Sequence, residues 1–389
     1  MRILTICGDH GVPVFGRKGA STHLREMIAA LRRAGHDVAL AAADLSGDRR
    51  EDEDFRTFKL PRPTAKILGF DGRYIIADRF SDSVLREAAA RFRPDAIYER
   101  SALYFQAGAR MARAWKLPRI LEVNTLLAEE MSTRLKFPRL AAKTEDRLLR
   151  EAPGIAAISG VMARRLTEEK GVAADRIKVL TMAVDPQRFQ NRGRRGVLRA
   201  KLGVEFDTPL IGYIGSMNHY HQPARFLELA QGAREAERPA MFAMVGGSGA
   251  KVERYREEAA AFTGATRFHV EGPVPQEDLR DWIEALDLVV IPGAAPQSTP
   301  TKIFEVAAIG TPMLLPETEP IRELCAGAAE ACVVGESELP AALERWFADR
   351  ACLAEPARRL GERVRADYTW DHHARVVGDW FAAMKAGES

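Results

Sequence analysis

The sequence has few of the features that mark metalloproteins, membrane proteins or nucleic-acid-binding proteins. Its four cysteines are scattered, with no CxxC pair and no histidine at ligand spacing, so we expect reduced thiols and no zinc site. No apolar run approaches the roughly 18 residues of a membrane-spanning helix, and the apolar segment Met1–Cys7 is too short for a signal peptide. The net charge of +3 gives no reason to expect a nucleic-acid partner. We therefore expect a soluble, cytoplasmic protein.

The composition is that of a globular protein long enough for two domains. Apolar residues make up 46% of its 389 residues and charged residues 29%. Strand-like and helix-like segments alternate, which is typical of an α/β fold with parallel sheets. The strands expected in the first half are Arg2–Cys7, Val38–Ala43, Ala96–Tyr98, Arg119–Val123, Ile155–Ile158 and Lys178–Thr181. Those expected in the second half are Leu210–Ile214, Met241–Val245, Arg267–Val270, Leu288–Ile291 and Met313–Leu315.

The same pattern predicts the domain boundaries. An amphipathic helix follows the first strand, with apolar residues at helical spacing from Leu24 to Leu31, and Ser21 or Thr22 could cap it. Residues 186–208 begin with Pro186, are rich in Gly and Arg, and interrupt the alternation, so we predict a hinge there and a solvated loop for its basic run. This leaves an N-terminal domain over 1–185, a C-terminal domain over 209–369, and an amphipathic last segment over 370–389.

The most informative segment is the polar loop that leads into a helix at Pro296–Glu305. The N–H groups of Thr301 and Lys302 would open that helix, where anions bind, and Lys302 adds a full charge there. Glu305 lies one turn further on the same face, and its carboxylate could accept hydrogen bonds from two adjacent hydroxyls. A phosphate site next to a diol site describes a nucleotide.

This segment resembles the donor-site pattern SPxKxFExxAxGxP of the family-4 glycosyltransferases, and the chain is similar to that family over essentially its whole length. The resemblance implies a GT-B architecture, in which two Rossmann-like parallel-sheet domains face a cleft. It assigns the acceptor to the first domain and the nucleotide-sugar donor to the second. It also implies that the last helix, 370–389, crosses back onto the first domain.

Further donor residues are assigned through the resemblance. Gly215 and Ser216 match the turn that meets the donor diphosphate; the usual basic residue is missing, and His221 lies nearest to that role unless it is structural. The glycine-rich run after residue 244 matches the base-binding wall, where backbone groups near Val274 read the base. Because backbone readout leaves no trace of the base in the sequence, we prefer a UDP-sugar only slightly over a GDP-sugar as the donor. The implied donor site is Gly19, Gly215, Ser216, His221, Gly246, Gly247, Val274, Gln297, Thr299, Pro300, Thr301, Lys302 and Glu305.

The acceptor side is assigned in the same way. The glycine-containing loop Gly8–Gly19 is long for a βα loop and lacks the GxGxxG fingerprint. It matches a family loop that ends in GGxxxH near the acceptor, with Lys18 in place of the first glycine, although His23 could equally line its helix face. Arg119–Glu130 fits an EVNxPLxxE-like variant, in which buried Glu122 could instead accept from backbone N–H groups. The implied acceptor-side residues are Gly16, Lys18, His23, Asn124 and Glu129.

The resemblance also predicts the chemistry, with two departures from the family. Asn124 stands where many relatives have histidine, and Gln297 stands where a second acid is usual. No DxD-type acid pair lies in a loop, so we expect no cofactor and a metal-independent, retaining transfer that uses Lys302, Glu305 and Asn124. A GT-B epimerase or a non-catalytic nucleotide-sugar-binding scaffold remains an alternative.

The acceptor's identity leaves no trace in the sequence. A sugar, a lipid-linked sugar and a small molecule are all compatible. The segment Arg134–Lys143 combines basic and apolar residues and could contact the inner face of a membrane weakly, although an ordinary solvated helix is the preferred interpretation.

Overall fold

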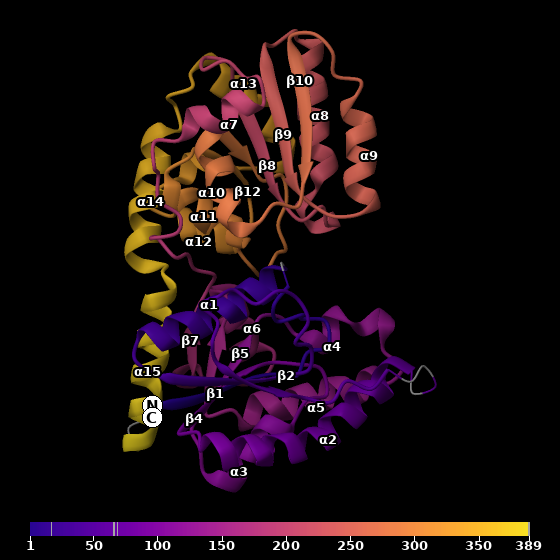
Figure 1. Cartoon of the computed structure of the whole chain (residues 1–389), viewed down its shortest axis with the longest axis vertical. Coiled ribbons are helices and arrows are strands. Elements are labelled where there is room, and N and C mark those ends of the chain that lie inside the picture. The colour runs from indigo at the N-terminus through magenta and orange to yellow at the C-terminus, as the bar shows by residue number, and fades with distance from the viewer. Residues whose placement is uncertain (17, 65–66, 68, 388–389) are drawn as a thin grey trace. The chain divides into compact units, whose positions relative to one another are not determined.

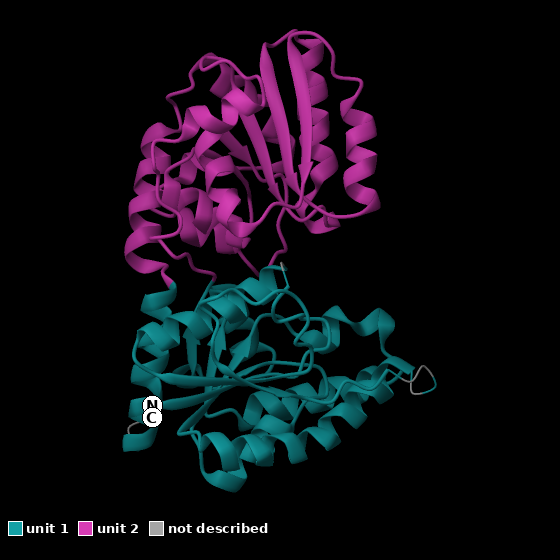
Figure 2. Cartoon of the chain, viewed as in Figure 1, with its two compact units in different colours: residues 1–181, 370–389 teal, residues 182–369 magenta. Residues whose placement is uncertain are grey.

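The computed structural model of the protein describes residues 1–16, 18–64, 67 and 69–387. The chain divides into two compact units (Figure 2). Unit 1 contains residues 1–181 together with 370–389, and unit 2 contains residues 182–369. Each unit is built around one parallel sheet with helices on its faces (Figure 1). The predicted class, α/β with two Rossmann-like parallel sheets, is confirmed for each unit.

Unit 1 has a seven-stranded sheet in the order β3-β2-β1-β4-β5-β6-β7. Its strands are β1 (Arg2–Cys7), β2 (Asp37–Ala42), β3 (Arg56–Lys59), β4 (Ala96–Arg100), β5 (Arg119–Val123), β6 (Gly154–Ala157) and β7 (Ile177–Val179). Its α-helices are α1 (Gly19–Arg33), α2 (Gly69–Phe92), α3 (Ala107–Trp115), α4 (Leu127–Glu130), α5 (Pro138–Glu151), α6 (Gly160–Glu168) and α15 (Trp370–Ala386). A 3₁₀ turn, η2 (Ser132–Arg134), follows α4.

Unit 2 has a six-stranded sheet in the order β10-β9-β8-β11-β12-β13. Its strands are β8 (Leu210–Gly215), β9 (Ala240–Gly246), β10 (Thr266–Gly272), β11 (Leu288–Val290), β12 (Met313–Pro316) and β13 (Val333–Val334). Its α-helices are α7 (Arg195–Lys201), α8 (Pro223–Glu235), α9 (Ala250–Ala259), α10 (Gln276–Ala285), α11 (Thr301–Ile309), α12 (Glu319–Cys325), α13 (Leu339–Ala348) and α14 (Ala354–Asp367).

The order of the strands reverses at one point in each sheet. The chain builds outward from β1 to β3 and then returns to place β4 on the other side of β1; in unit 2, β11 joins β8 in the same way. In open parallel sheets, ligands bind beyond the carboxyl ends of the strands at such a reversal. Each unit therefore has one edge on which a ligand site is expected.

Buried apolar side chains explain why the elements pack as they do. The strand β1 is almost entirely buried, in keeping with a parallel strand covered on both faces. Helix α1 buries Leu24 and Leu31 with the apolar residues between them, as its spacing predicted. Helix α15 packs on α1 and buries Trp370 and Phe381. Among the described residues, no helix has the length and apolarity needed to cross a bilayer.

The segment 186–208, for which a hinge was predicted, belongs to unit 2. Parts of its backbone and some of its arginines have acidic partners there. The Glu284 carboxylate accepts hydrogen bonds from the backbone N–H groups of Arg192, at 3.1 Å, and Arg194. The buried guanidinium of Arg199, in α7, bonds to Asp287 at 3.1 Å. These bonds hold the segment to α10 and to the residue before β11. The side chains of Arg192 and Arg194 are exposed in a loop, as expected, whereas Arg195 begins α7 and pairs with Asp287.

Two local expectations also need correction. Helix α1 begins at Gly19, so Ser21 and Thr22 lie within its first turn and do not cap it. Ser21 instead donates from Oγ to the carbonyl of Pro13 at 2.6 Å. Most predicted strands differ from the observed ones by one or two residues at their ends, while β3 and β13 were not predicted.

Candidate functional site

The predicted donor residues of unit 2 follow the carboxyl ends of four neighbouring strands. The strands β10, β9, β8 and β11 are adjacent and parallel, so the segments after them reach the same edge of the sheet. Gly215–Ser216 follow β8, Gly246–Gly247 follow β9, Val274 follows β10, and the loop to Thr301 follows β11. The fold thus gathers these separate segments along one edge.

The turns after β8 and β9 are in direct backbone contact. Gly247 donates its N–H to the carbonyl of Gly215 at 3.1 Å. Gly246 has φ +120°, and a Cβ atom added there would lie 2.1 Å from that same carbonyl oxygen. Any side chain at position 246 would therefore push the two turns apart, so only glycine fits.

The loop after β8 also contacts the loop after β11. The ring Nδ1 of His221 lies 3.4 Å from the carbonyl oxygen of Gly293. Burial lowers the pKa of His221, although the Gly293 carbonyl acts in the opposite direction. The ring therefore carries little positive charge near pH 7, and a role of His221 at the donor diphosphate stays a prediction. A cation that the sequence interpretation missed is Lys251, whose Nζ donates to the Met217 carbonyl at 2.9 Å.

Helix α11 carries the most informative pair of the sequence. It begins at Thr301, two positions after buried Thr299, and Gln297 lies half-buried in the loop before it. The Nζ of Lys302 donates to Oε2 of Glu305 at 2.6 Å, so the two side chains share one face as predicted. The Glu305 side chain is 2% exposed and that of Lys302 29% exposed. A charged donor and a charged acceptor therefore lie together at the amino end of a helix.

Unit 1 places a buried carboxylate at the end of β5. Glu122 accepts hydrogen bonds from the hydroxyl of Tyr98 at 2.8 Å, Nη1 of Arg100 at 2.5 Å and Nδ2 of Asn124 at 2.5 Å. Nε2 of His23 lies 3.1 Å from Oε2, the oxygen that also accepts from Tyr98. Burial alone would raise the pKa of Glu122, but His23 and Arg100 more than offset this and hold it well below its usual range. Glu122 is thus an ionised acceptor for side chains, not for backbone N–H groups as the alternative held.

This carboxylate brings two of the predicted acceptor-side residues together. Asn124 and His23 share Glu122, although they lie about a hundred positions apart in the sequence. The His23 ring also contacts Trp370 of α15 edge-on, with ring centroids 5.0 Å apart. Burial lowers the pKa of His373, which also lies in α15, to about 3, and His23 and His372 lower it further. The His373 ring is therefore neutral near pH 7. His23 therefore does more than line a helix face.

The remaining acceptor-side residues lie in two other places. The loop after β1 folds back on itself, because Lys18 donates from Nζ to the Gly11 carbonyl at 3.1 Å and Gly16 donates its N–H to Pro13 at 2.9 Å. Position 17 of that loop lies outside the described residues. Glu129 is exposed and pairs with Arg165 of α6 at 2.6 Å. Glu129 thus does not join the Glu122 cluster.

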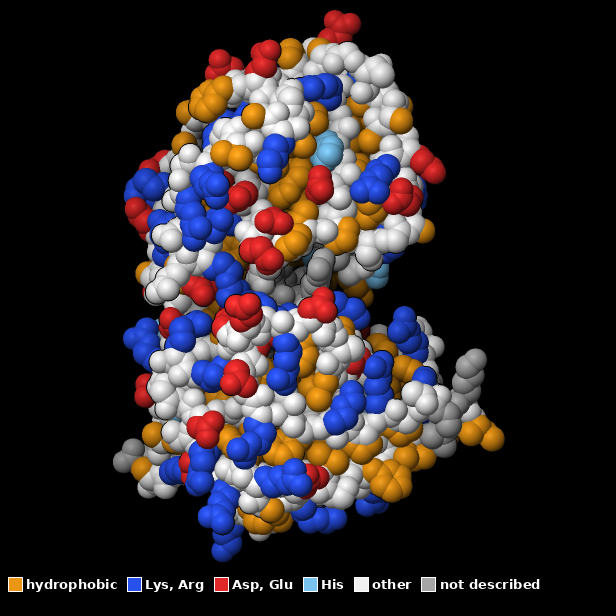
Figure 3. Space-filling view, in the orientation of Figure 1, with side chains coloured by type: hydrophobic (Ala, Val, Ile, Leu, Met, Phe, Trp, Pro, Cys, Tyr) orange, Lys and Arg blue, Asp and Glu red, His pale blue; other side chains and the backbone are white. Residues whose placement is uncertain are grey.

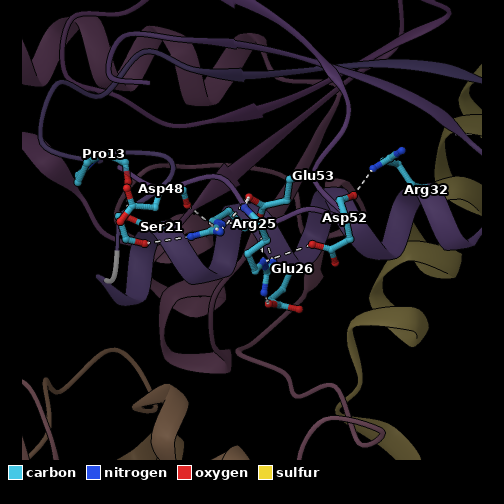
Figure 4. A network of polar contacts seen from close by, with 10 residues as sticks. Pro13, Ser21, Arg25, Glu26, Arg32, Asp48, Asp52 and Glu53 are labelled. Atoms are coloured by element: carbon cyan, nitrogen blue, oxygen red, sulfur yellow. Dashed lines mark hydrogen bonds and ion pairs between the residues drawn. The ribbon is translucent and has the colours of Figure 1, made fainter. Parts of the chain in front are cut away.

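A polar network holds the end of that loop against α1 (Figure 4). Arg25 in α1 donates from Nη2 to Oε2 of Glu53 at 2.8 Å and from Nη1 to the Gly16 carbonyl at 3.4 Å. Arg50 bonds to Glu26 at 3.0 Å, which ties the segment before β3 to the same helix. These charge-assisted bonds fix the backbone around Gly16.

Two cluster members were not predicted from the sequence. Tyr98 and Arg100 belong to β4, the strand beside β5 and β1. Arg100 ends that strand, so the strand-end reasoning applied to unit 2 would have found it. Within the described residues, no group of three His, Cys, Asp or Glu side chains is arranged to hold a metal ion.

Two family models match the chain. The model described as a glycosyl transferase 4-like domain matches residues 18–182, and the one described as glycosyl transferase-like matches residues 224–377. Together they cover most of both units.

Curated relatives match along nearly the same range. D-inositol 3-phosphate glycosyltransferase of Xylanimonas cellulosilytica is 26% identical over 394 aligned positions, covering 94% of this chain and 91% of the relative. The enzyme of the same name from Geodermatophilus obscurus is 28% identical, covering 79% of this chain and 70% of the relative.

Solved structures show the same fold. Sucrose-phosphate synthase of Thermosynechococcus elongatus superposes with a TM-score of 0.74 at 17% identity, covering 99% of both chains. Anabaena HepE in complex with UDP has a TM-score of 0.75 at 16% identity, covering 98% of this chain and 100% of that chain. The chain belongs to the family-4 glycosyltransferases and has their GT-B fold.

Proposed function

We propose that this glycosyltransferase takes its sugar from a nucleoside-diphosphate sugar and passes it to an acceptor hydroxyl with retention of configuration and without a metal ion. The observation that carries the proposal is the edge of unit 2, where two touching glycine turns and the Lys302–Glu305 pair follow adjacent strands. Glycine turns let backbone N–H groups approach phosphate closely, and a helix terminus with a lysine attracts it.

The two residues of the α11 pair are suited to bind different parts of the nucleotide. Glu305 is buried and ionisable, so its carboxylate is suited to accept from the two ribose hydroxyls. Lys302 and the first N–H groups of α11 would neutralise the charge that grows on the diphosphate as it departs. Because HepE was crystallised with UDP and with UDP-glucose, a UDP-sugar is the first donor to test.

The transfer would occur on one face of the sugar. The bond from the anomeric carbon to the diphosphate oxygen breaks, the bond to the acceptor oxygen forms on the same face, and the acceptor's proton passes to the departing diphosphate. We propose that Asn124 contacts the transferred sugar, because it directly follows β5 at the carboxyl edge of the unit 1 sheet and its amide is held by Glu122. The relatives are named for D-inositol 3-phosphate, which puts phosphorylated polyols among the acceptors to test.

The surface of unit 1 motivates a weaker proposal, that of peripheral membrane contact. Phe80, Phe137 and Leu140 are exposed. On the face seen in Figure 3, basic side chains lie among apolar ones over unit 1. Such surfaces can contact anionic lipid headgroups.

The deciding experiment incubates the purified chain with candidate UDP- and GDP-sugars and separates the products by chromatography. We expect slow release of nucleoside diphosphate without acceptor and faster release with one, both unchanged by EDTA. Formation of a new sugar nucleotide would identify an epimerase, and no product despite binding would identify a scaffold. Loss of activity on chelation, restored by Mg²⁺ or Mn²⁺, would refute metal independence.

Glu305→Ala is the matched variant for this test. It should weaken binding of the nucleoside diphosphate roughly tenfold to hundredfold, since a hydrogen bond to a charged group is lost. Unchanged affinity in a folded variant would show that the nucleotide binds elsewhere. Glu129→Ala, an exposed acid of unit 1, is the control and should bind as the unmodified chain does.

A further inference from the structure

The sheet of unit 1 ends on one side in an edge strand, β3. Of the described strands, only β2 pairs with it. Leu60, directly after β3, donates its N–H to the carbonyl of Ala42 in β2 at 2.9 Å. Alternate residues of a strand bond to the same side, so Phe58 also faces β2, whereas Thr57 and Lys59 direct their N–H and C=O groups to the open side. The edge therefore offers two donors and two acceptors to an added strand.

A groove of about 710 Å³ runs between this edge and helix α2. It is lined by the whole of β3 and by Val84, Glu87 and Arg91, which lie along one face of α2 because they recur at i, i+3 and i+7. Phe58 of β3 is buried in the same apolar cluster as Leu85 of α2, so strand and helix are packed together. An extended peptide that adds a strand to a sheet edge, with its alternate side chains in pockets, is a recurring mode of recognition. An edge strand beside a groove suits this mode.

The groove is positively charged. Its lining contains three cations, Arg56, Lys59 and Arg91, and one acid, Glu87, which pairs with Arg91 at 3.0 Å. Arg56 donates from Nη1 to the backbone carbonyl of Arg91 at 3.0 Å, which ties the strand to the end of the helix. A guanidinium carries five N–H donors, so both arginines keep donors for a further partner. The Lys59 side chain is exposed beside them.

These charges decide which partner fits the edge. Two copies of the chain paired through β3 would bring two rows of basic side chains together, and such side chains on an edge strand discourage that pairing. The acidic residues just before β3 do not line the groove, and Glu53 among them is held by Arg25 at 2.8 Å. An acidic partner, in contrast, would bring carboxylates to guanidinium groups that still have free donors.

We propose that the groove between β3 and α2 is a docking site for an extended, acidic segment of another protein, which adds a strand to the sheet of unit 1. The backbone of that segment bonds to the outward groups of Thr57 and Lys59, and its carboxylates lie among the basic side chains of the lining. Three strands separate β3 from β5, after which Asn124 lies. The proposal rests on this edge of unit 1 and does not depend on the proposed transfer.

The test measures binding of labelled heptapeptides to the full chain by fluorescence anisotropy. The probe is a peptide in which Glu and Val alternate, and its counterpart has Lys in place of every Glu. We expect the acidic peptide to bind at low ionic strength and to weaken as salt is added, because exposed charges are screened. The basic peptide should bind at least roughly tenfold more weakly. No binding of the acidic peptide, or equal affinity for the two peptides, would overturn the proposal.

Strand addition is tested on the peptide backbone. In an added strand the N–H groups of alternate residues face β3, and the others face away from it. The acidic peptide is therefore also made with N-methyl groups on its Val residues only, or on its Glu residues only. One of these two peptides should lose binding while the other keeps it. Equal effects of the two methylation patterns would show that charge alone holds the peptide and would refute an added strand.

Charge reversal on the chain locates the site. The double variant Arg56→Glu/Lys59→Glu should bind the acidic peptide at least roughly tenfold more weakly than the unmodified chain. Lys201→Glu is the control, because Lys201 is an exposed lysine of α7 in unit 2. An equal loss in the control would place the peptide elsewhere and overturn the proposal. The peptide comparisons use the unmodified chain, so they decide the question even if the double variant folds poorly.

Sedimentation velocity of the chain alone tests a second copy as the occupant. We expect no dimer that an excess of the acidic peptide dissociates. A dimer that this peptide dissociates, and that Arg56→Glu/Lys59→Glu alters, would assign the edge to a second copy of the chain and refute an acidic partner.

Discussion

Replacing Glu122 should destabilise unit 1 far more than replacing any exposed acid. Its carboxylate accepts from Tyr98, Arg100 and Asn124 and faces His23, and it is almost fully buried. Glu122→Ala would leave the guanidinium of Arg100, 11% exposed, without its carboxylate. Breaking a buried ion pair in this way costs about 3–5 kcal/mol. Glu122→Gln keeps one acceptor oxygen and should cost about 1–3 kcal/mol.

Urea unfolding monitored by hydrogen exchange at the amides of β4 and β5 isolates the effect in unit 1. With an m-value of about 2 kcal/mol per M, the midpoint should fall by about 2 M in Glu122→Ala. Glu129→Ala is the matched control from the same segment. Its carboxylate is 66% exposed and pairs only at the surface with Arg165, so its cost should stay below about 1 kcal/mol.

The result that would refute this reasoning is an equal, small shift for Glu122→Ala and Glu129→Ala. It would mean that Arg100 and its neighbours find other partners or water when the carboxylate is removed. A large shift in Glu122→Gln equal to that in Glu122→Ala would instead show that the negative charge, and not hydrogen bonding, holds the cluster. UDP binding should be unchanged in all three variants, because the proposed nucleotide residues other than Gly19 belong to unit 2.

Three further predictions concern other parts of the chain. Lys302→Ala should lower kcat roughly a hundredfold and leave uridine binding nearly intact; an equal loss of both would contradict a role at the diphosphate. Because the pKa of His373 falls from 6.5 to about 3 on folding, the unfolded chain binds the extra proton, and stability should fall as the pH drops below 6.5. His373→Gln should flatten this slope by up to about 1.4 kcal/mol per pH unit in urea titrations, and equal slopes would refute the assignment. Gly246→Ala should abolish UDP binding, whereas Gly249→Ala, whose added Cβ meets open space, should keep it; similar losses would mean that backbone strain, not the contact with Gly215, matters.

The sequence predicted the strands whose residues are nearly all apolar, and also the edge strands β7 and β10, in which polar and apolar residues mix. The central strands β1 and β5 are buried on both faces, and their bounds match the prediction. The edge strand β3 has a single buried residue among its four, Phe58, so it carries no apolar run to recognise. The strand β13 has two residues, too few for any periodic signal. A run of apolar residues is enough to predict a buried parallel strand. The short strands β3 and β13 have no such run, and their extended conformation depends on the strand that each one pairs with.

The grouping of donor segments was predictable for the same reason. Once the strands are placed, a parallel sheet brings their carboxyl ends to one edge, and the order of the chain identifies the loops there. The protonation of His221 was not predictable, because it depends on how much water reaches the ring. The partners of Glu122 were not predictable either, since His23 and Arg100 come from other elements and their side-chain orientations decide the contact.

Glu122 determines how the side-chain amide of Asn124 is oriented. A carboxylate can only accept, so the Asn124 group that faces Glu122 must be its NH₂, as the 2.5 Å contact from Nδ2 has it. Glu122 takes one of the two N–H donors of Nδ2, so the second N–H and the acceptor Oδ1 are left for a ligand. A neutral histidine at this position could present either a donor or an acceptor, depending on its tautomer. Glu122 thus fixes which way the Asn124 amide faces at the carboxyl edge of β5, and under the proposed function this amide can both donate to and accept from a sugar hydroxyl.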